Sequence, residues 1–470
     1  MTQLDAEPLL IGMIGAAPKM SADVAGSKAT QLWRMANLGL EVPPAFVLPT
    51  GLCTALNEQV RDSRQALDQG LRKGIARLEA ATGRRLGDSR SPLLVSVRSG
   101  AAKSMPGMLE TILNVGLNDE TVHGLIRMSG NPRLAWDSYR RFMQGYAEVV
   151  HGVGSADFDR RLSDMMQKEG VERETDLDPE ALERLAIDFR EIASGLSAQA
   201  PKDPMEQLSA AALAVYRSWQ SQRAREYRRL NRLDDLKGTA VTVQAMVFGN
   251  AGGKSGAGVA FSRSPATGAN EFYLDFLFDA QGEDVVSGRR TPSSASQLEA
   301  RLPQVFKRLQ DGARRLEQEF GDVQDIEFTV EDGHLFFLQT RSAKRTPSAA
   351  LRIAVDLARE GVIDIKTALA RVSDIDLDRV GAARFNHPAE PIATAISASP
   401  GVASGRVAFD SAYAKQLAAA GEPVILVRPD TSTEDVAGFA VSTGILTAIG
   451  GRTAHAAVVA RQLGKVCLVG

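Results

Sequence analysis

The chain has 470 residues, of which 44% are hydrophobic and 24% charged, and its formal net charge at pH 7 is −2. This length predicts several domains, each with its own hydrophobic core. Because the charges balance, no broad field of one sign favours a nucleic-acid partner or a membrane surface. The two cysteines are too few for a disulfide framework, and no apolar stretch reaches membrane-spanning length, so we expect a soluble, cytoplasmic protein.

Periodicity and composition predict an α/β (α+β) multidomain chain with five parts. Residues 1–117 combine helix and strand signals, whereas residues 118–235 carry apolar side chains at helical spacing among many charged ones. Strand signals return in residues 236–345. Residues 346–390 predict connecting helices and a polar linker, and residues 391–470 predict a compact α/β unit.

Several local segments stand out within these parts. A small-residue turn at residues 23–29 leads into a helical pattern, and a buried strand is predicted at residues 93–98. A glycine-rich segment at residues 249–258 lies between two predicted strands. Such a loop suits a backbone that closes over a ligand, although hairpin loops use glycine as well. A helical segment is predicted at residues 297–320.

Two strands after that helix carry polar residues in alternation. Asp325 and Glu327 share one face of the first strand, and Gln339 and Arg341 share one face of the second. A two-residue turn would place Gln339 on the face opposite to Glu327. We therefore predict a three-residue loop with Gly333 in the left-handed conformation, which pairs Glu327 with Gln339 and Asp325 with Arg341.

Two adjacent carboxylates with a glutamine form a hard-oxygen site of the kind that Mg²⁺ prefers. Arg341 would then be available to phosphate oxygens. The same spacing also fits a solvated sheet face with ion pairs, and spacing alone does not decide between the two interpretations.

Residues 450–461 place a histidine at the start of a small-residue helix. We predict Thr453 as the N-cap and Gly464 as the stop. In the first turn, His455 would lie among backbone N–H groups that favour negative charge, so a phosphate acquired by a neutral imidazole would be held there. A capping or surface histidine is the alternative. The final strand, residues 466–469, is expected to have an incomplete edge and neighbours.

Taken in order, several segments resemble the pyruvate, phosphate dikinase family of phosphoenolpyruvate-utilising enzymes. Residues 104–108 favour this family over the related water-dependent phosphoenolpyruvate synthases. The segments that carry the resemblance are residues 95–101, 104–108, 137–142, 249–250, 256–261, 280–286, 324–328 and 338–341, and the Gly-Gly-x-Thr-x-His stretch ending at His455.

The resemblance implies an ATP-grasp nucleotide-binding domain with a helical insertion, followed by a swivelling phosphohistidine β/α domain. In the family's reaction the histidine attacks the β-phosphate of ATP and releases AMP. Inorganic phosphate then takes one phosphoryl group to give pyrophosphate, and the phosphohistidine passes its group to pyruvate on a separate C-terminal barrel. The chain stops at Gly470 without such a barrel, so we expect a fragment or a shortened relative.

The resemblance also assigns roles to individual residues. His455 would be the nucleophile, and Lys28, Arg98 and Arg341 would act on the ATP phosphates. Asp325 and Glu327 would bind Mg²⁺ with support from Gln339. The nucleotide contacts implied in addition are Gly107, Gln244, Met246, Gly256 and Gly258.

The implied partners are ATP, phosphate and pyruvate, together with a kinase or phosphatase that acts on Thr453; a homodimer is also compatible. The plain alternative for Thr453 is that it only caps the helix. Two other functions stay open at this point. A nucleotide-binding or regulatory module without turnover would bind ATP and release no AMP. An ATP-grasp carboxylate ligase would give ADP, but it has no use for the histidine segment.

Overall fold

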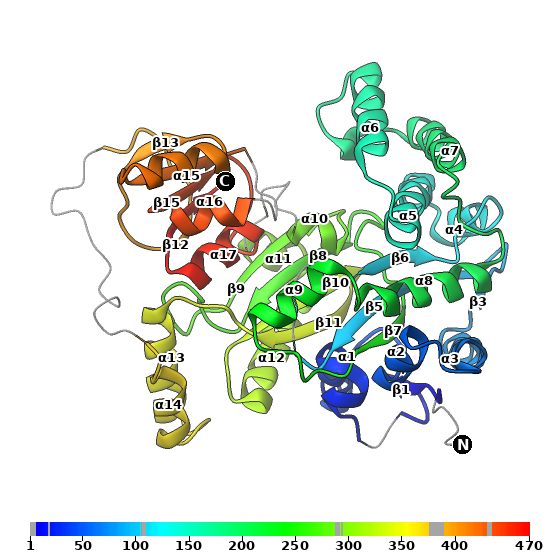
Figure 1. Ribbon diagram of the computed structural model, residues 1–470, viewed down its shortest axis with the longest axis horizontal. Helices are drawn as coiled ribbons and strands as arrows, with labels where there is room; N and C mark the ends of the chain where they lie inside the picture. Colours follow the sequence, from blue (N-terminus) through cyan, green and yellow to red (C-terminus); the bar gives the residue numbers. More distant parts are fainter. Residues whose placement is uncertain are drawn as a thin grey trace. The chain divides into compact units, whose positions relative to one another are not determined.

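The computed structural model describes residues 6–16, 19–103, 105, 110–286, 292, 295–375, 390–429 and 435–470. The chain forms two compact units, Met1–Val247 and Phe248–Gly470, each with its own sheets and helices (Figure 1). The mixed α/β character predicted from the sequence is confirmed.

The first unit is built on a five-stranded antiparallel sheet with the order β1-β2-β7-β5-β6. Its central strand β7 is buried along its whole length, which agrees with its valine- and threonine-rich sequence. A short parallel pair, β3 and β4, lies outside this sheet. The strands are β1 (Leu9–Ile11), β2 (Ala45–Leu48), β3 (Arg85–Leu86), β4 (Pro92–Leu93), β5 (Val95–Ala101), β6 (Thr111–Val115) and β7 (Thr239–Ala245).

The section between β6 and β7 is helical and its described residues contain no strand, as predicted. The predicted break near residues 201–204 lies between α7 and α8, and α5 packs on both β6 and α7 (Figure 1). The helices of the first unit are α1 (Ala22–Asn37), α2 (Thr50–Asn57), α3 (Ser63–Thr82), α4 (Thr121–Ser129), α5 (Pro132–His151), α6 (Ala156–Glu169), α7 (Pro179–Gly195), α8 (Pro204–Ser218) and α9 (Gln222–Leu230).

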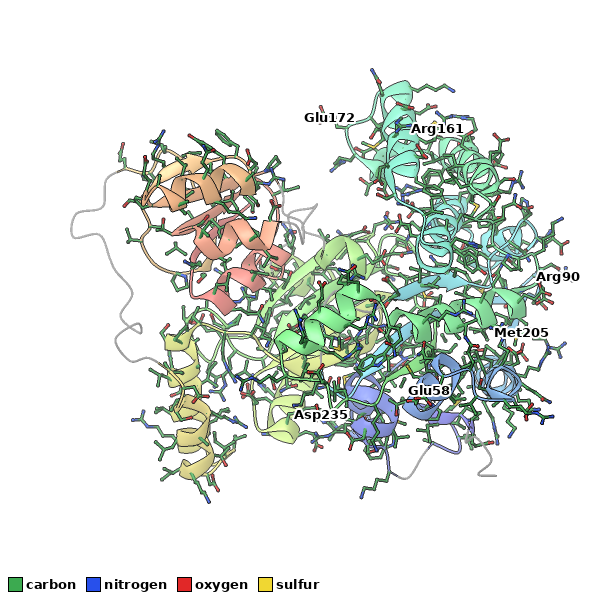
Figure 2. The ribbon with its side chains drawn as sticks, viewed as in Figure 1. Glu58, Arg90, Arg161, Glu172, Met205 and Asp235 are labelled. Atoms are coloured by element: carbon green, nitrogen blue, oxygen red, sulfur yellow. The ribbon has the colours of Figure 1, made fainter. Side chains whose placement is uncertain are left out.

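Charged side chains of both signs cover the outside of this unit. Figure 2 labels Arg90, Glu172 and Asp235, which are exposed in loops of this unit. Opposite charges often pair on the surface, as Arg161 does with Asp188. No helix among the described residues is both long enough and apolar enough to cross a membrane.

The second unit contains a four-stranded antiparallel sheet with the order β11-β10-β8-β9. The helical segment predicted at residues 297–320 is confirmed, and it consists of two helices. Leu302 has a non-helical conformation (φ −134°, ψ 64°) because Pro303 follows it, and Pro303 starts α12. The elements of this part are β8 (Gly256–Phe261), β9 (Tyr273–Phe278), α10 (Gly282–Val286), α11 (Ala295–Arg301), α12 (Pro303–Phe320), β10 (Gln324–Glu331) and β11 (His334–Ser342).

The hairpin between β10 and β11 has the predicted pairs, Asp325 with Arg341 and Glu327 with Gln339, but a different backbone connects the two strands. The predicted three-residue loop is wrong, because Glu331 pairs with His334 around a two-residue turn. Asp332 (φ 45°) and Gly333 (φ 79°) both have positive φ, which matches the twist of the flanking strands. A bulge on β11 at Leu338 then shifts the register by one residue.

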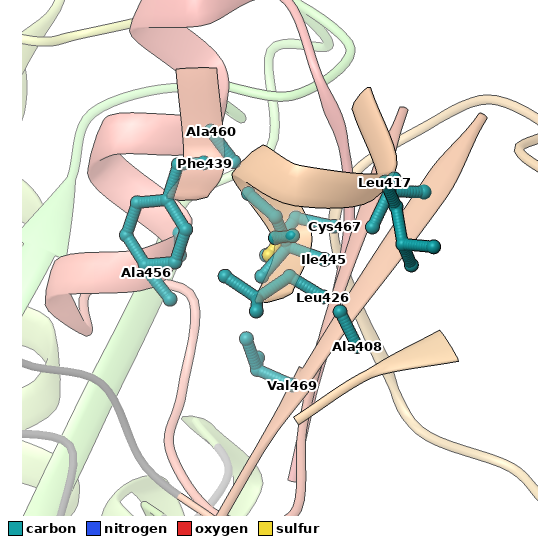
Figure 3. Close-up of a cluster of buried hydrophobic side chains, with 13 residues drawn as sticks. Ala408, Leu417, Leu426, Phe439, Ile445, Ala456, Ala460, Cys467 and Val469 are labelled. Carbon is teal, nitrogen blue, oxygen red and sulfur yellow. The ribbon is translucent and has the colours of Figure 1, made fainter. Parts of the chain in front are cut away.

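A third sheet, with the order β12-β16-β15-β14-β13, is parallel except for the β12–β16 pair. Figure 3 shows part of its apolar core, to which Phe439, Ile445 and Cys467 contribute. The final strand β16 pairs with β12 and β15 on its two sides, so the expected incomplete edge is wrong. The remaining elements are α13 (Pro347–Arg359), α14 (Ile365–Val372), β12 (Ile396–Ser399), β13 (Arg406–Ala408), α15 (Ser411–Ala419), β14 (Val424–Arg428), α16 (Val436–Val441), β15 (Gly444–Thr447), α17 (His455–Leu463) and β16 (Val466–Val469).

Candidate functional site

The predicted polar residues of the β10–β11 hairpin lie on one face of the four-stranded sheet in the second unit. Residues directly opposite each other on antiparallel strands project from the same face. The register therefore sets two neighbouring rows across β11, β10, β8 and β9. These rows are Arg341–Asp325–Phe261–Tyr273 and Gln339–Glu327–Val259–Asp275.

The predicted cross-strand partners contact each other through their side chains. Arg341 Nε donates to Asp325 Oδ2 at 2.9 Å, and Gln339 Nε2 donates to Glu327 Oε1 at 3.4 Å. The other oxygen of Asp325, Oδ1, is buried and has no hydrogen-bond partner among the described residues. Protein groups of the described chain thus satisfy only one of the two oxygens of the Asp325 carboxylate.

Burial and charge act on this pair in opposite directions. Burial raises the pKa of Asp325 above its usual value; Arg341 lowers it, and the neighbouring Glu327 raises it further. Burial also works against the charged form of Arg341, but Asp325 and Glu327 hold its pKa above the usual value. A second cation at Asp325 would relieve the cost of burying its negative charge.

The donor set fits Mg²⁺. Asp325 offers an unpartnered carboxylate oxygen, Glu327 lies beside it on the same face, and Gln339 orients the Glu327 carboxylate. No group of three or more His, Cys, Asp or Glu side chains in the described part of the chain is arranged as a metal cage. A site with few protein ligands suits Mg²⁺ that shares its coordination with substrate phosphates and water.

In the first unit, a close backbone contact brings the Lys28 segment to the strand that carries Arg98. Gly26 interrupts α1 with φ 77° and ψ 160°. A Cβ atom at Gly26 would lie 2.1 Å from the carbonyl oxygen of Gly100 on β5, so only glycine allows this approach. Lys28 lies in α1 two residues after this interruption, and both Lys28 and Arg98 are half-buried.

The glycines predicted to contact nucleotide have packing reasons of their own. Gly256 and Gly258 lie within β8, and Cβ atoms there would meet the rings of Phe276 at 2.1 Å and Phe328 at 2.5 Å. Gly107 lies outside the described residues. The nucleotide contacts of these glycines stay predictions.

The predicted adenine-strand residues have internal partners as well. The side chain of Gln244, on β7, donates to the carbonyl oxygen of Pro43 at 3.1 Å. The backbone N–H of Met246 donates to the carbonyl oxygen of Leu94 at 2.9 Å. Any adenine contact at Met246 would therefore use its carbonyl or side chain. That contact also stays a prediction.

His455 is the first residue of α17, and Gly464 ends this helix with φ 64°, as predicted. The predicted N-cap is wrong, because Ala454 occupies that position and Thr453 lies one residue before it. Instead, the amide and the hydroxyl of Thr453 both donate to Asp275 Oδ2, each at 2.9 Å. The segment before the histidine is thereby bound to β9.

The sequence interpretation did not single out Asp275. Its carboxylate is buried and accepts a third hydrogen bond from Tyr273, and the Arg452 guanidinium lies 4.6 Å above the Tyr273 ring. Burial and then Asp275 raise the pKa of the Tyr273 hydroxyl, which stays protonated as a donor. The signal in the sequence was one acidic residue within the otherwise apolar strand 273–278.

Two protein-family models match this chain and define its class of protein. A family model described as "Pyruvate phosphate dikinase, AMP/ATP-binding domain" matches residues 59–305 and 295–361. A second model, "PEP-utilising enzyme, mobile domain", matches residues 420–470. The match to the first model contains the carboxylate hairpin, and the match to the second contains His455.

The chain belongs to the pyruvate, phosphate dikinase family. It is 46% identical over 451 residues to the pyruvate, phosphate dikinase of Clostridium symbiosum, 45% identical over 463 residues to that of Rhizobium meliloti and 44% identical over 450 residues to the chloroplastic one of Flaveria pringlei. Each alignment covers 95% of this chain but only 52%, 52% and 47% of the relative, respectively. The chain therefore spans about half the length of these relatives.

Proposed function

We propose that this chain is a dikinase-type phosphotransferase module in which ATP and phosphate phosphorylate His455. The observation that carries the proposal is the shared sheet face of the second unit. Asp325 and Glu327 lie in the same rows as Tyr273 and Asp275, and Asp275 binds the segment directly before His455. This arrangement supports a metal–phosphate site and a nucleophile segment within one unit.

In the proposed reaction, a ring nitrogen of His455 attacks the β-phosphorus of ATP. The bond from that phosphorus to the oxygen bridging it to the α-phosphate breaks, and AMP leaves with this oxygen. Inorganic phosphate then attacks the γ-phosphorus and releases pyrophosphate, which leaves phosphohistidine. Phosphoryl transfer of this kind depends on positioning and on fixed positive charge around the phosphates.

The assigned residues supply those two requirements. Lys28, Arg98 and Arg341 are proposed to contact the phosphates. Asp325 and Glu327 are proposed to hold Mg²⁺, with Gln339 keeping Glu327 oriented. When bound, Mg²⁺ would neutralise phosphate oxygens and so lower the repulsion against an incoming nucleophile.

Further assignments belong to the same proposal. An ATP-grasp domain would span residues 1–345 with its helical subdomain at 118–235, a linker would span 346–390, and a swivelling domain would span 391–470. Transfer to pyruvate would require a barrel. A phosphate on Thr453 would face the Asp275 carboxylate and would oppose binding of the histidine segment, which suits regulation.

Intact-mass measurement after incubation with ATP, phosphate and Mg²⁺ tests the proposal. We expect a phosphoryl adduct on the wild-type chain and none on the His455→Asn variant. Nucleotide analysis of the same reaction should give AMP, whereas a ligase would give ADP and a binding module would leave ATP intact. A wild-type chain without an adduct, or an adduct that survives in His455→Asn, contradicts the proposal.

A further inference from the structure

Arg461 on α17 is an unusual buried cation. It is 1% exposed, and its Nη1 donates to the carbonyl oxygens of Arg452 at 2.8 Å and Ala398 at 3.3 Å. Its Nε and Nη2 are buried and have no hydrogen-bond partner among the described residues. A buried donor without an acceptor costs about 1–3 kcal/mol. The bonds to the two carbonyl oxygens therefore use only part of the hydrogen-bonding capacity of the Arg461 guanidinium group.

The two unpartnered nitrogens lie on the same edge of the planar guanidinium. This edge presents two parallel N–H groups, which match two oxygens of one phosphate or carboxylate group. Nη1, which holds the backbone carbonyls, is not needed for such a contact. Arg461 can therefore keep its structural bonds and bind an anion at the same time.

The guanidinium group of Arg461 lies close to the sheet that carries the carboxylate hairpin. Its guanidinium carbon lies 5.9 Å from the centroid of the Phe261 ring, and Phe261 is the neighbour of Asp325 in the sheet register. The charges of Arg461 and Asp325 act on each other's pKa, although no hydrogen bond joins them. Asp325 Oδ1 is itself buried without a hydrogen-bond partner among the described residues. A metal-bound phosphate would satisfy both groups.

We propose that Arg461 is a phosphate-binding residue, whose Nε and Nη2 donate to two oxygens of the phosphoryl group held beside Asp325 when the histidine segment contacts β9. The proposal rests on the phosphotransfer function above and deepens it. The helix that begins with His455 thereby brings its own cation to the phosphoryl group. The phosphate site is complete only while Thr453 is bound to Asp275.

Calorimetric titration of the full chain with pyrophosphate and Mg²⁺ tests this without requiring turnover. We expect Arg461→Gln and Arg461→Lys each to weaken pyrophosphate binding by about tenfold or more, since one charge-assisted hydrogen bond contributes about 1.5–3 kcal/mol. Lysine keeps the charge but lacks the two-donor edge. Lys465→Gln, which removes a positive charge just after the same helix, is the matched control and should bind like the wild type.

Amide hydrogen exchange across residues 451–458 separates anion binding from a purely structural role. In Arg461→Lys we expect weaker binding with exchange like that of the wild type. Unchanged affinity in the Arg461 variants overturns the proposal, as does wild-type protein that does not bind pyrophosphate. If every Arg461 variant that loses affinity also shows faster amide exchange, the role of Arg461 is structural, and this outcome also overturns the proposal. Arg461-dependent binding without any phosphohistidine would instead contradict only the proposed function.

Discussion

At the scale of single residues, the buried carboxylates Asp275 and Asp325 differ in what satisfies them. Both oxygens of Asp275 accept protein hydrogen bonds, from Tyr273 and from Thr453. Asp325 receives one from Arg341 and keeps a buried oxygen without a partner in the described chain. A fully satisfied carboxylate fixes structure, whereas a half-satisfied one retains the capacity to bind a cation.

This difference predicts the effect of Asp325→Asn. The amide keeps the shape of the side chain but loses the charge, so the affinity for a divalent ion with ATP should fall by about tenfold or more. Binding of Mn²⁺, followed by electron paramagnetic resonance in the presence of ATP, measures it. Asp311→Asn, at an exposed position on α12, is the control. Equal Mn²⁺ binding in both variants would contradict the assignment.

The two cysteines offer a prediction that does not depend on function. Burial raises the pKa of Cys53 to about 11 and that of Cys467 to about 12. Near pH 8 both thiols are protonated and buried in the folded chain, so a disulfide reagent should modify neither until denaturant exposes both. As the pH rises from about 9 towards 11, the unfolded chain loses thiol protons that the folded chain keeps, so the free energy of unfolding should fall. Rapid modification of the native chain near pH 8 would contradict this prediction.

At the scale of elements, the sequence predicted which residues pair but not the backbone that pairs them. The predicted pairing of Asp325 with Arg341 is confirmed, although it was predicted from a three-residue loop that the chain does not have. The two-residue turn and the compensating bulge at Leu338 were not predicted, because a bulge leaves the alternation of polar residues intact on either side. Likewise Thr453 has the residue type of an N-cap, and its long-range bond to Asp275 has no local signal.

The interruption of α1 at Gly26 allows a paired test of element geometry. Gly39, just after the same helix, also has a positive φ (71°), but a Cβ atom there would have no atom of the described residues within 4 Å. Gly39→Ala should lower the free energy of unfolding by about 1 kcal/mol through backbone strain alone. Gly26→Ala adds the clash with Gly100 and should cost more than about 3 kcal/mol.

Urea unfolding measures both changes, and titration with ATP provides a second measurement. Because Gly26 holds the Lys28 segment against β5, we expect Gly26→Ala also to weaken ATP binding, whereas Gly39→Ala should leave it unchanged. Equal losses of stability in the two variants would mean that the close contact with Gly100 contributes nothing.

At the scale of the whole molecule, composition and segment order were enough to predict the mixed α/β class and the family. The division into Met1–Val247 and Phe248–Gly470 was not predicted, because it depends on how densely distant segments pack. The contact between Asp275 and Thr453 is of the same kind, since it joins residues 178 positions apart. Such contacts decide which parts of a chain move together, and they are where regulation by charge can act.

A negative charge at Thr453 should release the histidine segment from β9. In Thr453→Glu, a second carboxylate would face buried Asp275, and like charges in a poorly solvated place repel strongly. We expect faster amide hydrogen exchange at residues 273–278 and 451–458, measured by mass spectrometry. Thr443→Glu, at an exposed position of the same unit, should change neither segment.

Charge can be separated from size by combining two substitutions. Asp275→Asn removes the repelling partner, so the double variant Thr453→Glu with Asp275→Asn should recover part of the lost protection, because a neutral amide can donate to the new carboxylate. If the double variant exchanges as fast as Thr453→Glu alone, steric exclusion rather than charge separates the segments. If Thr453→Glu exchanges like the wild type, the Asp275–Thr453 contact does not hold the histidine segment. Only a charge-dependent release would let one phosphate on Thr453 control access of His455 to the carboxylate hairpin.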